Sequence, residues 1–277
     1  MPELPEAETV KRALEKHLPG CCFTRIETFV PALRFTLDPL HDPVLLSRKI
    51  IAVRRRARYL VVEMTDNRAL IFHLGMTGTV RIAAPDVPRL KHEHVIFYLD
   101  NGLTFRFEDP RRFGFILPCI LPQAGADPVE LAGLGPEPLS NDFTPEYLFK
   151  ALQGKKMKLK TALMDNAIVV GVGNIYANES LFLSGLNPAC AAGTVSLAQC
   201  RVLVGHICAT LRRAIEAGGT TVSDFKGVDG EEGRFVLQLN VYGKNGAPCP
   251  RCGATIERVV IGGRGSFYCP ACQPANN

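Results

Sequence analysis

The stretch CPRCGATIERVVIGGRGSFYCPAC, residues 249–272, contains two Cys-x2-Cys pairs separated by sixteen residues. Two such pairs bring four thiolates to one tetrahedral centre, the usual way in which proteins hold structural zinc. Residues 256–268 alternate like two short strands that turn at Gly262-Gly263. Two disulfides are the alternative, which a reducing compartment disfavours. The stretch predicts a zinc ribbon with one structural Zn ion and four ligands: Cys249, Cys252, Cys269 and Cys272.

The composition is that of a globular protein, with 47% hydrophobic and 21% charged residues in a chain of 277. The N-terminus lacks the basic segment and apolar run of a signal peptide, and no stretch is apolar for long enough to span a membrane. We therefore expect a cytoplasmic protein with no membrane partner. Six of the ten cysteines lie outside the ribbon and are expected to be free thiols.

The net charge of +5 is modest, but the positive charges cluster in two runs. The first is RRRAR at 54–58 and the second is KKMKLK at 155–160. A basic run either binds an acidic partner or forms a solvated face, and the runs alone leave both interpretations open.

Short strands are expected from residue 22 to about residue 120. In HVIFYLDNGLTFRFED, residues 94–109, two alternating runs are joined by Asn101-Gly102, which predicts a hairpin with a two-residue turn. RALIFHLGMTGTVRIA, residues 68–83, contains two more strand-like runs with a glycine-flanked tip at Met76. Many short strands without helices between them favour an antiparallel β-sandwich.

Helices are expected at the start of the chain and in its second half. Residues 6–18 have one apolar helical face, and Pro19-Gly20 ends that helix. Thr144-Pro145 is a helix start, and Ser196 with Gln199 forms a capping box for a helix that runs to about Glu216. The predicted class is therefore α+β, an N-terminal β-sandwich with a flanking helix followed by a helical part that ends in the zinc ribbon.

The very start of the chain, MPELPE, combines two prolines with two carboxylates. Pro5 and Glu6 suit the first turn of a helix, where proline fits sterically and a negative charge complements the helix dipole. Helix chemistry gives no reason for Pro2 and Glu3.

Several further motifs occur in a fixed order along the chain: PELPE at 2–6, HLGMTG at 73–78, DPRRFG at 109–114, LMDN at 163–166, GVGNIYANE at 171–179, GGTT at 218–221 and VYG at 241–243. Together with the ribbon, these motifs resemble the formamidopyrimidine-DNA glycosylases, relatives of endonuclease VIII, from Pro2 to about Gln273. The ELPE form is similar to the branch that acts on oxidised purines. The resemblance implies a helix–two-turn–helix element and three domains: 1–130, 131–240 and 241–277.

The resemblance also implies a bifunctional enzyme acting on double-stranded DNA. It would excise 8-oxoguanine or formamidopyrimidines and then cut the strand at the abasic site by β,δ-elimination. Once Met1 is removed, Pro2 presents a secondary amine that can form a Schiff base with the sugar. An α-amine with a pKa near ~8 is far more often neutral at pH 7 than a lysine at ~10.4. The catalytic residues implied are Pro2, Glu3 as proton donor, Glu6, Arg58 and Arg264.

DNA contacts are implied in the same way. A base must leave the duplex to be reached, and three side chains would fill the gap: Met76, Arg111 and Phe113. Core packing is the alternative for Met76 and Phe113. The residues implied to contact phosphates are His92, Arg112, Lys155, Lys160, Asn174 and Arg264. A loop with Ser223, Asp224 and Phe225 would close over the extruded base.

One position departs from the family pattern. Where RRRAKYL is usual, this chain reads RRRARYL, with Arg58 in place of the lysine. Arginine keeps the charge but does not give up its proton at neutral pH. A damaged-DNA binding protein with impaired catalysis is therefore the alternative function. A proline-terminal tautomerase is a third class, which the ribbon and the basic runs disfavour. The resemblance also implies a monomer that is associated with the nucleoid.

Overall fold

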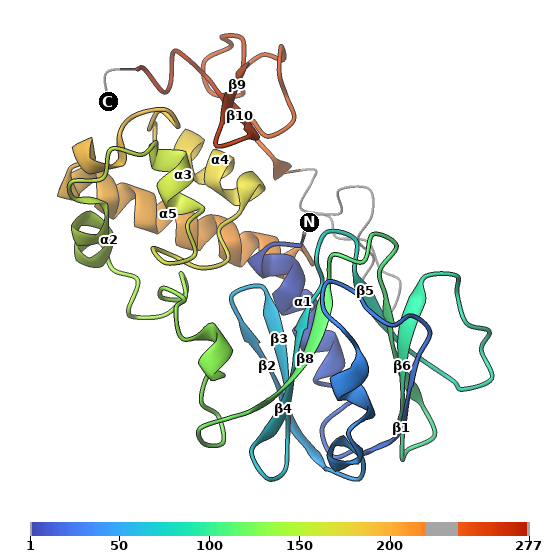
Figure 1. Cartoon of the computed structure of the whole chain (residues 1–277). Coiled ribbons are helices and arrows are strands. Elements are labelled where there is room, and N and C mark those ends of the chain that lie inside the picture. The colour runs from blue at the N-terminus through green and yellow to red at the C-terminus, as the bar shows by residue number, and fades with distance from the viewer. Residues whose placement is uncertain (1, 220–237, 276–277) are drawn as a thin grey trace. The chain divides into compact units, whose positions relative to one another are not determined.

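The computed structural model describes residues 2–219 and 238–275 (Figure 1). The chain divides into two compact units, the first built on residues up to Ala132 and the second on Gly133–Ala217 and the C-terminal segment. The first unit is rich in strands, and the second is helical and ends in a two-stranded ribbon, which confirms the α+β class. The finer division into three domains stays a prediction. No helix among the described residues has the length and apolar character needed to cross a membrane.

The part of the first unit that the structure describes forms two four-stranded antiparallel sheets, drawn as its two layers in Figure 1. One sheet has the order β2-β3-β4-β8, with bounds Ile50–Arg56, Tyr59–Met64, Arg68–His73 and Phe115–Ile120. The other has the order β1-β6-β7-β5, with bounds Phe23–Thr28, Glu93–Leu99, Thr104–Glu108 and Thr79–Ala83. The predicted β-sandwich is confirmed.

An aromatic core joins the two sheets. The ring of Phe72 in β4 lies 5.8 Å from that of Phe97 and 5.3 Å from that of Phe105, both in the opposite sheet. Helix α1 (Leu4–Leu14) buries its apolar face in the same cluster. The helix starts earlier and ends earlier than predicted, although Leu18 still packs into the core.

The hairpin between β6 and β7 is confirmed, but its turn is longer than predicted. A two-residue type I′ turn needs positive φ at both central residues. In the turn only Gly102 has a positive φ, of 82°. The Asn101 side chain accepts a hydrogen bond from the Leu103 N–H at 3.0 Å, and the Leu99 N–H donates to the Leu103 carbonyl at 2.9 Å. The turn therefore spans Asp100, Asn101 and Gly102.

The described residues of the second unit form four α-helices: α2 (Pro145–Leu152), α3 (Leu159–Leu163), α4 (Asn174–Leu183) and α5 (Leu197–Glu216). A short 3-10 helix lies at Ala192–Thr194, and three others lie in the first unit, at Asp38–His41, Pro43–Leu45 and Val129–Leu131. The Thr144 hydroxyl caps α2 by accepting from the Tyr147 N–H at 3.0 Å, and Ser196 with Gln199 forms the capping box of α5. Both predicted helix starts are confirmed.

The ribbon is a hairpin of β9 (Glu257–Ile261) and β10 (Arg264–Tyr268), joined by Gly262-Gly263. Both glycines have positive φ, as a two-residue type I′ turn requires. The turn predicted from the sequence is therefore the one observed.

Candidate functional site

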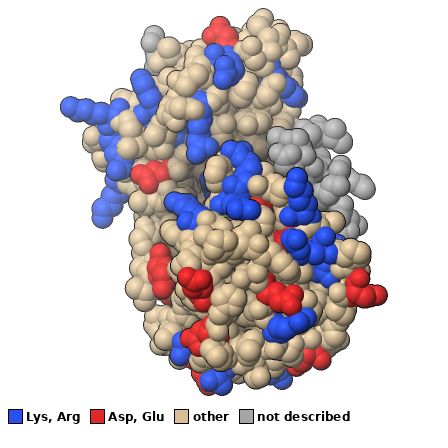
Figure 2. Space-filling model, turned by 45° about the vertical axis from the view of Figure 1, so that its right-hand side comes forward, with Lys and Arg blue, Asp and Glu red and all other residues tan. Residues whose placement is uncertain are grey.

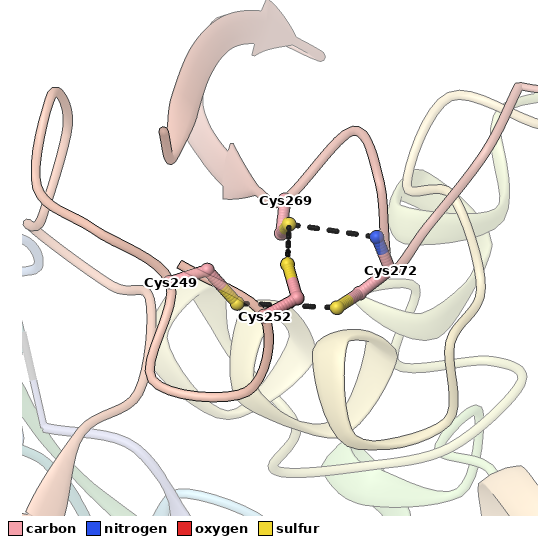
Figure 3. A group of neighbouring side chains, drawn as sticks. All are labelled: Cys249, Cys252, Cys269 and Cys272. Atoms are coloured by element: carbon pink, nitrogen blue, oxygen red, sulfur yellow. Dashed lines mark hydrogen bonds between the residues drawn. The ribbon is translucent and has the colours of Figure 1, made fainter. Parts of the chain in front are cut away.

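The four ribbon cysteines converge on one point (Figure 3). Their sulfur atoms lie within 4.8 Å of one another, with Cys249 and Cys272 at 3.9 Å and Cys252 and Cys269 at 3.5 Å. A disulfide needs ~2.05 Å. Tetrahedral zinc with Zn–S bonds of ~2.3 Å places the sulfurs roughly 3.8 Å apart. All ten cysteines are free thiols, so the disulfide alternative is wrong and the residues fit one structural Zn ion.

The N-terminal residues are packed into the first unit. Pro2 is buried, and Glu3 and Glu6 are only 3% and 2% exposed. Glu3 caps α1, and the Glu6 carboxylate accepts a hydrogen bond from the Glu3 N–H at 2.8 Å, which completes a capping box. Helix capping therefore explains how Glu3 and Glu6 are held in place. It also keeps these two carboxylates close to Pro2.

The basic run at 54–58 is largely neutralised within the first unit. Three of its arginines pair with carboxylates: Arg54 with Glu63, Arg55 with Glu8 at 2.8 Å, and Arg56 with Asp127 at 2.7 Å. The Glu8 pair fastens α1 to β2. Arg58 follows Ala57, whose φ is 55°, in the tight turn between β2 and β3. Three arginines of the run therefore bond β2 to β3, to α1 and to the segment at Asp127.

His73, at the end of β4, is a residue that the sequence reasoning did not single out. Burial, followed by the charges of Arg58 and Arg34, lowers the pKa of His73 to about 4. Its Nδ1 accepts a hydrogen bond from the Gly75 N–H at 3.1 Å, and its ring stacks on Phe115 with 5.3 Å between centroids. A neutral imidazole therefore helps to hold the turn that begins at Gly75.

We expect His73 to make the protein less stable as the pH falls from 6.5 towards 4. Its folded pKa is below its unfolded value of 6.5, so the unfolded state takes up the proton first and the contribution is complete only above pH 6.5. The shift is equivalent to about 3 kcal/mol of unfolding free energy. The variant His73→Asn keeps a hydrogen-bond acceptor at the Nδ1 position. Its unfolding free energy, measured with urea, should differ less between pH 7 and pH 4 than that of the native protein. His41→Asn, at an exposed site, should behave like the native protein; equal pH dependence in both variants would contradict the assignment.

Three candidate intercalating residues come together on the first unit's surface. Met76 and Phe113 are 39% and 48% exposed, so core packing, the alternative for these two residues, does not apply. The guanidinium of Arg111 lies 4.7 Å from the centre of the Phe113 ring. The three side chains belong to two turns, the first between β4 and β5 and the second between β7 and β8. Because β4 and β5 belong to different sheets, the first turn crosses from one layer to the other.

Asp109 joins these two turns and was also missed. It is fully buried, and its two carboxylate oxygens accept hydrogen bonds from the Thr77 hydroxyl and from the Gly114 N–H, both at 2.7 Å. The backbones approach closely, since a Cβ added to Gly75 would lie 2.4 Å from the Gly114 nitrogen. One carboxylate and two glycines therefore fix the relative position of the two turns.

The residues predicted to contact phosphates are placed as follows: His92 and Lys155 are half-buried, Arg112 is exposed, Asn174 begins α4, and Arg264 is exposed at the start of β10. In Figure 2 the second unit shows many Lys and Arg side chains and few Asp and Glu, whereas the first unit shows both signs. Ser223, Asp224 and Phe225 lie outside the described residues.

Lys160 is placed differently from the prediction. Its side chain is fully buried, and its ammonium donates hydrogen bonds to the Gly265 carbonyl at 2.9 Å and to the Ser266 hydroxyl at 2.7 Å. The basic run at 155–160 therefore has an inward-pointing member that contacts the ribbon in place of the predicted phosphate.

Domain models of known families match most of the chain. The formamidopyrimidine-DNA glycosylase N-terminal domain matches residues 1–116, and the H2TH domain of the same enzymes matches residues 134–226. A zinc finger found in FPG and IleRS matches residues 246–275.

Relatives match over the whole length. The formamidopyrimidine-DNA glycosylase of Alcanivorax borkumensis is 46% identical over 276 residues, which cover 99% of this chain and 100% of the relative. That of Hahella chejuensis is 45% identical over 274 residues, with the same coverage. A Lactococcus lactis Fpg, solved with DNA containing an abasic site, superimposes with a TM-score of 0.87 at 32% identity, covering 98% of this chain and 99% of that one. The chain belongs to the formamidopyrimidine-DNA glycosylase family.

Proposed function

We propose that the protein repairs oxidised purines in DNA, removing the damaged base and then cutting the strand at the abasic site. The observation that carries the proposal is the N-terminus, where Pro2 adjoins the buried carboxylates of Glu3 and Glu6. Full-length relatives named formamidopyrimidine-DNA glycosylases support it, as does a Lactococcus lactis Fpg solved with a Fapy-dG containing DNA. The protein is proposed to act as a monomer.

The first step is covalent. After Met1 is removed, the Pro2 nitrogen attacks C1′ of the damaged nucleotide, so that an N–C1′ bond forms as the glycosidic bond breaks and the base departs with its electron pair. The Pro2 nitrogen then gives up its N–H proton, which the departing base takes up. Glu3 donates a proton to O4′ as the C1′–O4′ bond breaks, so the deoxyribose ring opens and leaves an iminium between Pro2 and C1′. Glu6, held by the Glu3 N–H, keeps the amine and the sugar in place.

Two eliminations follow from this iminium, which acts as an electron sink. Loss of the C2′ proton breaks the C3′–O bond and expels the 3′ phosphate (β-elimination). Loss of the C4′ proton then breaks the C5′–O bond and expels the 5′ phosphate (δ-elimination). In each elimination the electron pair of the broken bond leaves with the phosphate. Arg264 contacts the second departing phosphate, where its fixed charge offsets the developing negative charge.

The damaged nucleotide must first leave the duplex. Met76, Arg111 and Phe113, exposed on two joined turns, take the place of the extruded base and keep the neighbouring base pairs apart. The side chains proposed to hold the phosphate backbone are His92, Arg112, Lys155 and Asn174.

Gel analysis of two duplexes tests this function. The native protein should cut a duplex with one 8-oxoguanine and a duplex with one pre-formed abasic site, in both cases leaving phosphates at the two ends of the gap. A damaged-DNA binding protein would shift both duplexes in a native gel and cut neither. That result would replace the proposal with the binding alternative.

Arg58 gives a prediction specific to this chain. Because arginine cannot pass on a proton at neutral pH, Arg58→Lys should raise the rate of base excision, by about tenfold if one proton transfer is restored at partial efficiency. Strand cleavage at a pre-formed abasic site should change by less than about twofold, since the Pro2 iminium forms there without base excision. Single-turnover rates on the two duplexes check this, and equal native and variant rates on both would refute it.

A further inference from the structure

We propose that Lys160 and Asn178 are positioning residues, which hold Arg264 in place for the second elimination. The proposal rests on the function proposed above for Arg264 and concerns the second unit alone. Arg264 is the first residue of β10 and is exposed. Among the described residues its guanidinium makes no ion pair or hydrogen bond, so the position of the guanidinium depends on how firmly the backbone of β10 is held.

Lys160 holds the backbone directly after Arg264. It comes from α3, and its ammonium donates to the Gly265 carbonyl at 2.9 Å and to the Ser266 hydroxyl at 2.7 Å. Lys160 and Ser266 are both fully buried. Burying an ammonium is costly unless it is hydrogen-bonded, so these contacts fix the lysine and the strand to each other.

Asn178 holds the next residue of the same strand. It comes from α4 and is buried, and its side-chain oxygen accepts a hydrogen bond from the Phe267 N–H at 2.7 Å. Its side-chain nitrogen donates to the Asn174 carbonyl at 2.6 Å. One amide therefore bonds both the strand that carries Arg264 and the first residue of α4, which is itself proposed to contact a phosphate.

Together these contacts form a clamp, defined here as Lys160 and Asn178 bonded to residues 265–267. The zinc ligands support β10 only at its other end, because Cys269 follows the last residue of the strand. At the turn end, Gly262 lies against α3, where an added Cβ would be 3.4 Å from the Thr161 hydroxyl. The clamp therefore holds β10 at the end next to Arg264, and the zinc ligands hold it at the end next to Cys269.

The clamp should matter for one of the two eliminations. The first proceeds through the Pro2 iminium, whose residues belong to the other unit. The second needs Arg264 at the departing phosphate, and a displacement of about 1 Å of a positioning group can cost about 100-fold in rate. Loosening the clamp should therefore leave β-elimination intact and slow δ-elimination.

The test uses the full-length, zinc-loaded protein and a duplex with one abasic site. Lys160→Met keeps the length of the side chain without its hydrogen bonds, and Asn178→Ala removes the second contact from a different helix. In each variant the ratio of δ- to β-elimination products should fall about tenfold, while borohydride trapping at Pro2 and the zinc content stay native. Lys158→Met, which removes an exposed charge from the same run, should keep the native ratio.

Combining each variant with Arg264→Ala shows whether the clamp acts through the arginine. If it does, the double variants have the product ratio of Arg264→Ala alone, whereas independent effects would multiply. A native ratio in both clamp variants, with a low ratio in Arg264→Ala, overturns the clamp and leaves the proposed function standing. A native ratio in Arg264→Ala overturns the role of the arginine and the clamp together. Failure of the native protein to cut either duplex overturns the proposed function itself.

Discussion

Pro2→Gly should lower the yield of the borohydride-trapped protein–DNA adduct by at least about 100-fold on a duplex with one 8-oxoguanine. Because glycine also has a terminal amine, the lower adduct yield measures the contribution of the secondary amine of proline. A secondary amine gives an iminium that has no proton to lose and stays cationic, whereas the imine from glycine must be protonated to draw electrons from the sugar. The pyrrolidine ring also prevents rotation about the N–Cα bond, so less conformational freedom is lost when the amine meets the sugar.

A pair of tagged proteins tests whether the free Pro2 amine is needed, without changing any residue of the fold. A tag before Pro2 turns its nitrogen into an amide, which is not nucleophilic, and should abolish trapping. The same tag at the C-terminus should leave trapping native. Both proteins should still bind the damaged duplex in a native gel. A trapped adduct of full yield in the N-terminally tagged protein would assign the nucleophile to another residue.

The fold could be predicted from the sequence wherever local chemistry decided it. The ribbon cysteines, its Gly262-Gly263 turn and the caps at Thr144 and Ser196 all depend on residues within a few positions of one another. The hairpin at Asn101-Gly102 shows the limit of such patterns. The same pair of residues also fits a three-residue turn, and the Asn101 side chain, by bonding the Leu103 N–H, favours that turn.

The candidate site was less predictable, because its supports are long-range. Asp109 bonds Thr77, a residue of another strand connection, and the spacing of carboxylates along the chain does not distinguish this from a surface position. His73 needed the structure for the same reason. For Lys160 the resemblance implied a phosphate contact, but only the packing of α3 against the ribbon shows that its ammonium points inward.

Gly75→Ala should separate the two turns that carry Met76 and Phe113. The backbone of Gly75 has a φ of 64°, and its new Cβ would lie 2.4 Å from the Gly114 nitrogen and 2.6 Å from the Phe113 carbonyl carbon. Both neighbours are backbone atoms that cannot rotate away, so one turn must move. We expect a loss of about 4 kcal/mol in unfolding free energy. Excision of 8-oxoguanine from a duplex should fall about 100-fold. The wedge, meaning the three intercalating side chains Met76, Arg111 and Phe113, fills the gap left by the extruded base only while its two turns keep their relative position.

Gly102→Ala provides the matched control, because it isolates the cost of positive φ. Gly102 has a φ of 82° in the turn between β6 and β7, and an added Cβ there meets no atom within 4 Å. This variant should lose only about 1 to 2 kcal/mol of unfolding free energy, the cost of placing a side chain in the left-handed region, and should excise 8-oxoguanine at the native rate.

Urea unfolding and single-turnover excision, measured on both variants, then divide the effect at Gly75 into backbone strain and collision between the turns. If both variants lose the same unfolding free energy and both excise 8-oxoguanine at the native rate, the close approach of Gly75 and Gly114 does not position the wedge. If Gly75→Ala alone loses excision at a temperature where it is still folded, the wedge depends on two turns packed backbone against backbone. A carboxylate at position 109 alone would then be too little to keep them together.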